Sequence, residues 1–544
     1  MQTERPLLTD KIVSFIPGEA IMDQVAAIDR VDLEKVYMRR ISRSLFFLLL
    51  SLLAASTVSS PASAQYVVNI DQNFNLGYPL EDRFAGSASA SYSAQRIARL
   101  TNGDVVVAGL VPLAYGSAGL NLGLARYDQS GNRIAWSNPT STYVSYFNRY
   151  ITYPNNGVDT FSQITGIAVN GSRIYVQINR PIGGEQDSKI VAFSDDGQFI
   201  GEYGAFTTAL REDGGGIVTY AFPLVPGLFA RRLIAVATYI NGSERRVVTI
   251  KRFVIASDGS LSVDNGFGPY GNGANDLPFP DSACQQQTQC WGLAEDTAIA
   301  GADTDAPRVY VAGYTVRDSV NDLRPAMLGI DGQTGNPLPN FGVSGVYVPS
   351  TIAVSMFLAF PPRITAQFFE SGAGTFDRIY VLWPAEPNGE GFANIQRYYS
   401  GSPAGNKLKL DPLFGFEGTF YLGCCVEAAG LAAEGDTVAV VGNRRSQINN
   451  GPILHDPFIL TIYGYGGSAA DSFSFLSHDA LRIDTGTRWG DANWRDVIST
   501  GSNDRSFMAT GQLGDDDSGT GRPQFGTLRY VSTLDVIFGN GFEP

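Results

Sequence analysis

The chain has only two histidines, His455 and His478, so chemistry by histidine has few candidates. No cysteine or carboxylate cluster stands beside either residue at the spacing of metal ligands. A Ser-His-Asp site assembled from distant parts of the chain stays open, but no Gly-x-Ser-x-Gly elbow supports it. Each histidine is better interpreted as a loop residue, and the sequence assigns no catalytic residue and no cofactor.

Two acidic clusters, Asp515-Asp516-Asp517 and Asp303-Thr304-Asp305, carry the oxygen ligands that calcium prefers. Neither follows the Asp-x-Asp-x-Asp-Gly spacing with its distal glutamate, so we interpret both as solvated turns and expect no metal. Paired carboxylates for glycan hydrolysis or lysis would have to converge from separate parts of the chain, and one sequence does not reveal such a pair.

Four cysteines offer redox chemistry. Cys284 and Cys290 enclose a short polar loop, and in an oxidising compartment a local disulfide is the natural interpretation. Cys424 and Cys425 are neighbours, and a bond between them would need a distorted peptide. A vicinal pair and two free buried thiols both stay open for these residues.

Aromatic residues in polar stretches are the remaining candidates for ligand contact. Trp489 and Trp494 bracket Gly-Asp-Ala-Asn in such a stretch, so we take them as weak candidates for a surface contact. Packing inside the fold is the competing explanation for most tryptophans.

The segment Gly329-Ile-Asp-Gly-Gln-Thr-Gly-Asn336 resembles the Asp-x-x-Thr-Gly turn of quinoprotein dehydrogenase propellers. In those enzymes the motif is expected to recur in most blades together with a tryptophan, and here it occurs once without one. A quinone-dependent enzyme is therefore kept only as an alternative.

Any such site would have to be positioned by the repeated elements of the chain. Seven short runs of β-branched or aromatic residues recur along it. Their starts are separated by 69, 59, 76, 70, 59 and 69 positions. We call these runs the anchors: Val105–Gly109, Ile174–Ile178, Leu233–Ala237, Val309–Gly313, Ile379–Trp383, Val438–Gly442 and Phe507–Gly511.

A second predicted strand follows each anchor, and several of these strands run into turns rich in Asp, Ser and Gly. A Phe-Gly element completes some units, as in Phe267-Gly268, Phe341-Gly342 and Phe414-Gly415. A similar piece near the N-terminus, Ile70-Asp-Gln-Asn-Phe74, lacks an anchor of its own.

This repeat predicts an all-β fold, a single β-propeller of about seven blades, with six or eight as alternatives. A unit of three or four short strands cannot bury both faces of its sheet alone, so units stack around an axis until the ring closes. We expect the unpaired N-terminal strand near Tyr66–Ile70 to join the last blade and close the ring. The anchors near 105, 174, 233, 309, 379, 438 and 507 mark the blades of a domain spanning 65–544.

Three sequence pieces follow one another in the repeat: an anchor ending in Ala-Gly, then Ala-Arg-Tyr-Asp-x-x-Gly, then Leu-Asp-x-x-Phe-Gly-x-Gly. This order resembles the delta-sixty repeat of exported bacterial β-propellers. Residues 105–132 match the first half, and 250–273, 326–345, 395–418 and 527–541 match later pieces. The resemblance implies a propeller fold and export, and it brings no catalytic residues with it.

The N-terminal region predicts export. A basic start around Arg39, Arg40 and Arg43 precedes an apolar run and then Ala62-Ser-Ala64, the pattern of a secretory signal peptide over residues 38–64. The apolar run is too short for a membrane span, so none is expected in the mature chain. We interpret residues 1–37 as a mis-assigned start, disordered and outside the fold.

The net charge of −14 would repel nucleic acid, and no basic stripe with interleaved aromatics opposes this. We therefore predict a monomeric, exported propeller at the periplasm, the outer surface or outside the cell. It would act without catalysis as a binding or scaffold module, with an unknown protein or glycan as its partner. The alternative is an enzyme that uses the axial funnel, of a carbohydrate-active or quinoprotein type. The C-terminal Ile537–Glu543 is either a sorting tag or the last Phe-Gly turn.

Overall fold

A computed structural model describes the strands and tight turns between residues 64 and 536. Residues 1–63 and 537–544 and several loops lie outside the described part, the longest of these loops being 83–92, 141–149, 205–211, 278–290, 350–360, 464–492 and 514–523. The signal peptide, the C-terminal segment, Cys284, Cys290, Cys425, His478, Trp489 and the two acidic clusters therefore fall outside it. All elements in the described part of the chain are strands. A search of these residues for a helix long and apolar enough to span a bilayer finds none.

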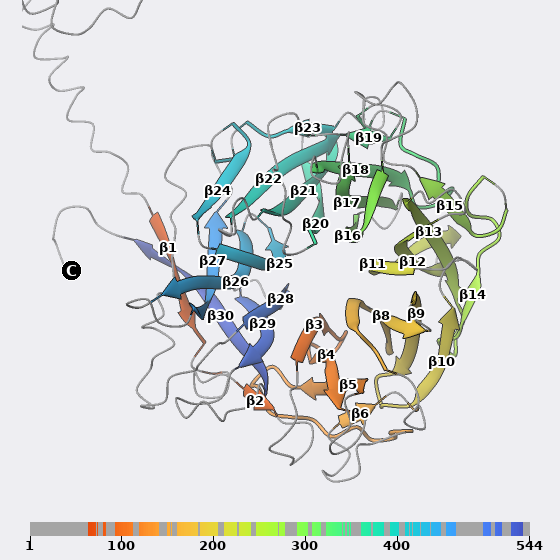
Figure 1. Cartoon of the computed structure of the whole chain (residues 1–544), viewed down its shortest axis with the longest axis horizontal. Coiled ribbons are helices and arrows are strands. Elements are labelled where there is room, and N and C mark those ends of the chain that lie inside the picture. Colours follow the sequence, from red (N-terminus) through yellow and green to blue (C-terminus); the bar gives the residue numbers. More distant parts are fainter. Residues whose placement is uncertain are drawn as a thin grey trace, which may run out of the picture. The chain divides into compact units, whose positions relative to one another are not determined.

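Seven separate antiparallel sheets form a ring, which confirms the predicted β-propeller of seven blades (Figure 1). We number the blades from the sheet that contains β3. Blade one comprises β3 (Ser93–Arg99), β4 (Val105–Pro112), β5 (Leu120–Tyr127) and β6 (Tyr150–Thr152). Blade two comprises β7 (Gln163–Asn170), β8 (Arg173–Ile182), β9 (Glu185–Ser194) and β10 (Phe199–Gly204). Blade three comprises β11 (Glu212–Val225), β12 (Leu228–Ile240), β13 (Arg246–Ile255), β14 (Leu261–Val263) and β15 (Ala274–Leu277).

The other four blades follow the same order from the axis outward. They comprise β16 (Trp291–Ala302), β17 (Arg308–Val316), β18 (Leu323–Asp331) and β19 (Val346–Tyr347); β20 (Arg363–Ser371), β21 (Gly374–Ala385), β22 (Phe392–Gly401), β23 (Leu408–Leu410) and β24 (Thr419–Cys424); β25 (Val426–Glu434), β26 (Thr437–Gln447) and β27 (Ile453–Tyr463); and β28 (Asn493–Ser499), β29 (Ser506–Leu513) and β30 (Gln524–Val536), joined by β1 (Ala64–Ile70) and β2 (Leu80–Asp82).

The anchors all fall on the second strand of a blade. This strand lies between two others and is covered on both faces by the neighbouring blades, so its residues are apolar without alternation. Val106, Val107 and Ala108 in β4, for example, are completely buried. Apolar clusters then join each blade to the next, as where Val106 and Ala108 pack with Ile174 and Val176 of β8.

The N-terminal strand closes the ring, as expected from the unpaired segment. Strand β1 runs antiparallel to β30, with Ala64 opposite Val536 and Ile70 opposite Tyr530. Asp71, directly after β1, forms an ion pair of 3.3 Å with Arg529 of β30. The piece that lacks an anchor of its own therefore supplies the outermost strand of blade seven.

One arginine recurs on the third strand of blades one, three, five and seven. Each forms an ion pair with an aspartate of its own blade: Arg126 with Asp104, Arg252 with Asp264, Arg397 with Asp411 and Arg529 with Asp71. These residues, which we call the third-strand arginines, are the Arg of the Ala-Arg-Tyr-type sequence in the repeat.

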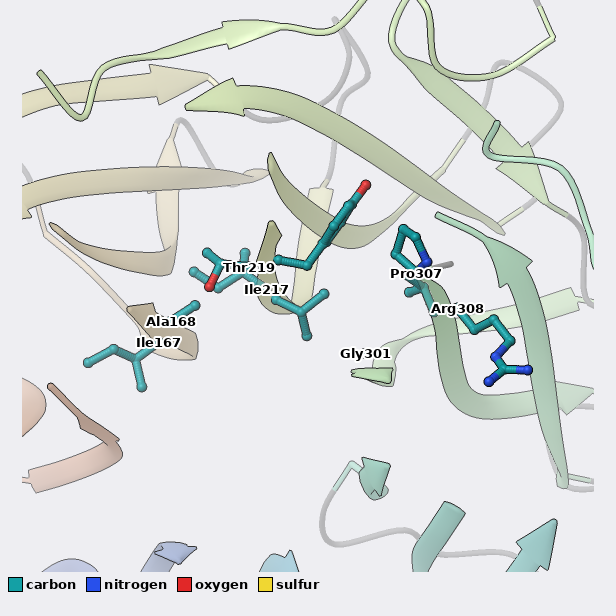
Figure 2. A pocket seen from close by; sticks show the side chains of 10 residues that line it. Ile167, Ala168, Ile217, Thr219, Gly301, Pro307 and Arg308 are labelled. Carbon is teal, nitrogen blue, oxygen red and sulfur yellow. The ribbon is translucent and has the colours of Figure 1, made fainter. Parts of the chain in front are cut away.

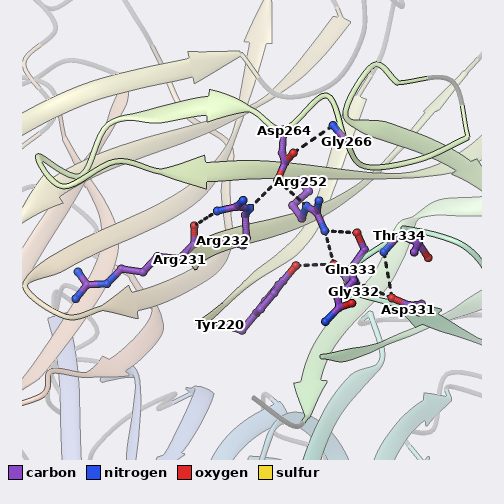
Figure 3. A network of polar contacts seen from close by, with 10 residues as sticks. All are labelled: Tyr220, Arg231, Arg232, Arg252, Asp264, Gly266, Asp331, Gly332, Gln333 and Thr334. Carbon is purple, nitrogen blue, oxygen red and sulfur yellow. Dashed lines mark hydrogen bonds and ion pairs between the residues drawn. The ribbon is translucent and has the colours of Figure 1, made fainter. Parts of the chain in front are cut away.

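Three third-strand arginines also reach the following blade. The Nη1 of Arg252 donates to the carbonyl oxygens of Gly332 and Gln333 at 2.7 and 2.5 Å, and the hydroxyl of Tyr220 donates to Gly332 at 2.6 Å (Figure 3). Arg126 reaches Asp195, and Arg529 reaches Gln129 of blade one across the closure. The Asp-x-x-Thr-Gly turn thus holds two blades together.

The Phe-Gly elements have a structural role as well. Phe267, Phe341 and Phe414 are completely buried. The guanidinium groups of Arg252 and Arg397 lie 4.7 and 4.8 Å from the ring centroids of Phe267 and Phe414. The glycine that follows each phenylalanine has a positive φ, which explains why glycine stands there.

Candidate functional site

The innermost strands form the wall around the propeller axis. Each contacts the innermost strand of the next blade, in the order β3, β7, β11, β16, β20, β25, β28 and back to β3 (Figure 1). Six of the seven carry an irregularity in their pairing with the second strand, and β20 alone pairs without one. Bulges of this kind re-aim side chains.

One residue of each inner strand lies at the same level along the axis, because each pairs with the fourth residue of its anchor. We call these seven residues the axial ring: Arg96, Gly166, Gly216, Ala298, Arg363, Gly430 and Asp496. Three are charged and four are small. The next residue in every inner strand is aliphatic, from Ile97 in blade one to Val497 in blade seven.

Side chains of the axial ring reach toward the following blade. The Nε of Arg96 donates to the carbonyl of Thr165 in β7 at 3.0 Å, and the Nε of Arg363 donates to Ala429 in β25 at 2.6 Å. Both acceptors are the bulged residues of their strands. The hydrogen bonds of both guanidinium groups to described residues run through Nε and Nη1, the latter to the carbonyl of the preceding residue.

The glycines of the axial ring stand where the next inner strand comes close. A Cβ on Gly166 would lie 2.8 Å from the backbone nitrogen of Ile217 and 2.9 Å from the Cα of Gly216. A Cβ on Gly430 would lie 2.9 Å from the Cα of Asp496. The ring therefore packs tightly at these blades, and only blades one, five and seven place a charged side chain at this level.

Asp496 provides the negative charge of the axial ring. Its Oδ2 accepts a hydrogen bond of 3.1 Å from the backbone N–H of Ile97 in the next blade. Burial raises the pKa of this carboxyl, while attraction to Arg96 and Arg363 opposes that rise. The two arginines of blades one and five thus both act on one carboxyl.

Burial and mutual repulsion lower the pKa values of the arginines, whereas burial raises that of Asp496. Burial, aided by repulsion from Arg96, lowers the pKa of Arg363 to about 9, and Asp496 opposes this. Burial also lowers the pKa of Arg96 and of Arg495, the residue before Asp496, although Asp496 opposes the shift of Arg96 and Glu427 that of Arg495.

We call Arg96, Arg363, Arg495, Asp496 and Glu427 the axial cluster. Three cations face two carboxylates, so the axial cluster carries surplus positive charge in a chain whose net charge is −14. Arg96, Arg363, Arg495 and Asp496 keep part of their surface accessible. A planar anion such as a carboxylate would relieve the repulsion and accept hydrogen bonds from the guanidinium groups.

An apolar pocket of about 350 Å³ lies along the inner strands of blades two to four (Figure 2). Its polar lining residues are engaged elsewhere: Thr219 donates to Val169 at 2.7 Å, Tyr220 to Gly332, and Arg308 pairs with Asp377. The lining comprises Ile167, Ala168, Ile217, Val218, Thr219, Tyr220, Gly301, Pro307, Arg308 and Val309.

The residues singled out from the sequence do not gather at this site. Trp494 is completely buried and packs with Phe507 and Tyr530, which corrects the expectation that it makes a surface contact. Cys424 ends β24 and His455 lies in β27, but their side chains are not among those described. Among the residues that the structure describes, no cluster of His, Cys, Asp and Glu could hold a metal.

Sequence reasoning missed every member of the axial cluster. Arg96, Arg363 and Asp496 precede their anchors by 9, 16 and 11 positions, because the hairpins between first and second strands differ in length. No fixed offset from the repeat could have brought them together.

Comparison with protein-family models gives no match, and comparison with curated proteins gives none. Among solved structures, the chain is similar to a phage phi92 endosialidase, with 10% identity, a TM-score of 0.38 and coverage of 88% of this chain and 71% of that one. It is similar to the polysaccharide lyase Uly1 at 10% identity and a TM-score of 0.38, covering 87% and 98%. The β-propeller domain of the trilobed protease from Pyrococcus furiosus matches at 9% identity and a TM-score of 0.30, covering 66% and 79%. These similarities concern the fold alone.

Proposed function

We propose that this protein is an exported propeller of the delta-sixty repeat type that binds a carboxylate-bearing ligand at its axis without transforming it. The observation that carries the proposal is the axial cluster, in which Arg96 of blade one and Arg363 of blade five both act on the carboxyl of Asp496, while three arginines stand against two carboxylates. Surplus positive charge beside the low-dielectric wall of the inner strands favours an anionic partner.

We take carboxylate as the anion to test, because it matches the fork geometry of a guanidinium group. Guanidinium groups recognise it through paired, charge-assisted hydrogen bonds, and each such bond is worth about 1.5–3 kcal/mol. The repulsion that lowers the pKa of Arg363 is also relieved when an anion binds. Binding energy is therefore available at the axis without any change in the blades.

The test is calorimetric titration of the purified protein with acetate, succinate and galacturonate, each against its neutral amide. We expect the acids to bind and the amides not to bind. Arg363→Met should weaken binding about 10- to 100-fold, since it removes one charge-assisted contact. Arg99→Met is the matched control, because Arg99 is exposed further along β3. Equal binding of acids and amides would refute the proposal.

An enzyme that uses the axial funnel is the second candidate, favoured by the raised pKa of Asp496 among arginines, a property of general acids. Turnover of an acidic glycan that Asp496→Asn abolishes would establish it. A binding module should instead retain or improve ligand affinity in the same variant, so one substitution separates the two functions.

A further inference from the structure

The axial cluster and the apolar pocket share two inner strands. Thr165 of β7 accepts the hydrogen bond from Arg96, and the pocket begins two residues later at Ile167 and Ala168. In β11 the axial ring residue Gly216 directly precedes the pocket residue Ile217. At about 3.3 Å per residue, the charged level and the pocket lie within about 10 Å along these strands.

The axial ring residues of β7 and β11 are Gly166 and Gly216, which carry no side chain. Neighbouring atoms fill the space beside them: the backbone of β11 lies against Gly166, and the side chain of Ile299 lies against Gly216. A ligand whose carboxylate contacts Arg96 would therefore run along the axial side of β7 and β11 to reach the pocket, not between the two strands.

The pocket selects for an apolar body. Ile167, Ile217, Val218 and Val309 present hydrocarbon, while the donors of Thr219, Tyr220 and Arg308 are engaged by other groups. A sugar hydroxyl placed here would face mostly hydrocarbon, and only the hydroxyl oxygens of Thr219 and Tyr220 could accept a hydrogen bond from it. A dry cavity of about 150 Å³ holds one benzene ring, so about 350 Å³ holds two fused rings or a medium alkyl chain.

We infer that the ligand is an amphiphilic monocarboxylate, with its carboxylate at the axial cluster and an aryl or alkyl body in the pocket between blades two and four. This inference rests on the proposed function and narrows its ligand class. It disfavours a plain acidic sugar as the preferred ligand, because most hydroxyls of such a sugar would face the hydrocarbon of the pocket.

The probe for this inference is 2-naphthoate, titrated into the purified protein and followed by calorimetry. We expect it to bind at least tenfold more tightly than acetate, which lacks the apolar body, and than 2-naphthol, which lacks the carboxylate. In a series from butanoate to decanoate, affinity should rise by about fourfold per methylene until the pocket is full.

Gly301→Leu tests where the apolar body lies. A Cβ on Gly301 would contact Val218 no closer than 3.7 Å, so a leucine fits without backbone strain and occupies the pocket. It should weaken 2-naphthoate binding at least tenfold and leave acetate binding unchanged. Gly204→Leu on β10 is the matched control, because nothing lies within 4 Å of its Cβ.

The outcomes separate the two proposals. If 2-naphthoate binding depends on Arg363 but not on the Gly301→Leu change, the pocket assignment fails and the axial anion site stands. If 2-naphthoate binds no better than acetate, the amphiphilic class is refuted. If neither acid binds at all, the proposed function fails together with this inference. Thermal unfolding of both glycine variants shows that they are folded.

Discussion

At the residue scale, the chemistry of the axis is a balance between three guanidinium groups and two carboxylates. Asp496 holds the backbone of Ile97 and at the same time offsets the charges of Arg96 and Arg363. The same carboxyl that stabilises the empty protein therefore competes with an incoming anion.

Replacing Asp496 by asparagine separates these roles. The amide oxygen still accepts the hydrogen bond from Ile97, while one negative charge leaves the axial cluster. We expect carboxylate affinity to rise several-fold in Asp496→Asn, measured by calorimetry at pH 7. Unchanged or weaker binding would show that the arginines do not act together on the ligand.

Carboxylate binding should also depend on pH through Arg363. Its pKa is lowered to about 9 by burial and by Arg96, so the guanidinium is charged at neutral pH and loses its proton as the pH rises through that value. Affinity should be constant between pH 6 and 8 and fall above about pH 9. Titrations at each pH check this, and Arg363→Met should show a flat profile over the same range.

Close packing of the axial ring gives a stability prediction. Gly166→Ala places a Cβ 2.8 Å from the backbone of Ile217, which the backbone cannot avoid without moving. We expect a loss of about 1–3 kcal/mol in the free energy of unfolding, measured by denaturant titration. Gly204→Ala, where the added methyl meets nothing within 4 Å, should change the same quantity by less than about 0.5 kcal/mol.

At the element scale, successive blades are joined by polar contacts as well as by apolar clusters. Three of the four third-strand arginines bind both an aspartate of their own blade and carbonyl groups of the next, so one side chain fixes the relative position of two sheets. This explains why the repeat carries arginine at a position that is largely buried.

Arg252→Met tests that role. Met retains the packing over Phe267 but removes the guanidinium donor from the carbonyl groups of Gly332 and Gln333, although Tyr220 still donates to Gly332. Asp264 keeps its ion pair with Arg232 and loses the one with Arg252. We expect a loss of about 2–4 kcal/mol in the free energy of unfolding. The exposed Arg231, in the neighbouring strand, is the matched control (Figure 3), and an equal effect of Arg231→Met would contradict the interpretation.

The second and third strands of the blades could be predicted from the sequence, whereas the inner strands could not, and the reason is physical. Second and third strands are buried on both faces, so runs such as Val105–Gly109 stand out as apolar. Six of the seven inner strands are bulged, and several are interrupted by polar residues or glycine, as in Gln95-Arg96 and Gly214–Gly216, so they show no such apolar run. Because the candidate site is built from inner strands, the fold was predictable and the site was not.

At the scale of the whole molecule, the ring depends on strand β1. It pairs with β30 along seven residues, and Asp71 adds an ion pair to Arg529. Without β1, the long edge of β30 would be open to pairing with other chains.

Removing residues 64–71 should therefore lower the thermal stability and produce oligomers, observed by light scattering after size-exclusion chromatography. A synthetic peptide with the sequence of residues 64–71 should restore the monomer by adding the missing strand in trans. A peptide with Asp71→Asn should restore it less well, since the ion pair with Arg529 is lost. A stable monomer without any peptide would show that β2 and the blade contacts suffice.

The register of β1 against β30 has a mechanical consequence. Because Ala64 lies opposite Val536, the two polypeptide ends leave the last blade at the same end of the strand pair. A force that pulls Ala64 and Val536 apart acts perpendicular to the strands, along the inter-strand hydrogen bonds. The bonds between β1 and β30 would therefore break one at a time, starting at this end. If the protein is pulled through both β1 and β30, we expect these two strands of blade seven to separate first and at low force. If it is held through only one of them, no force acts across this strand pair.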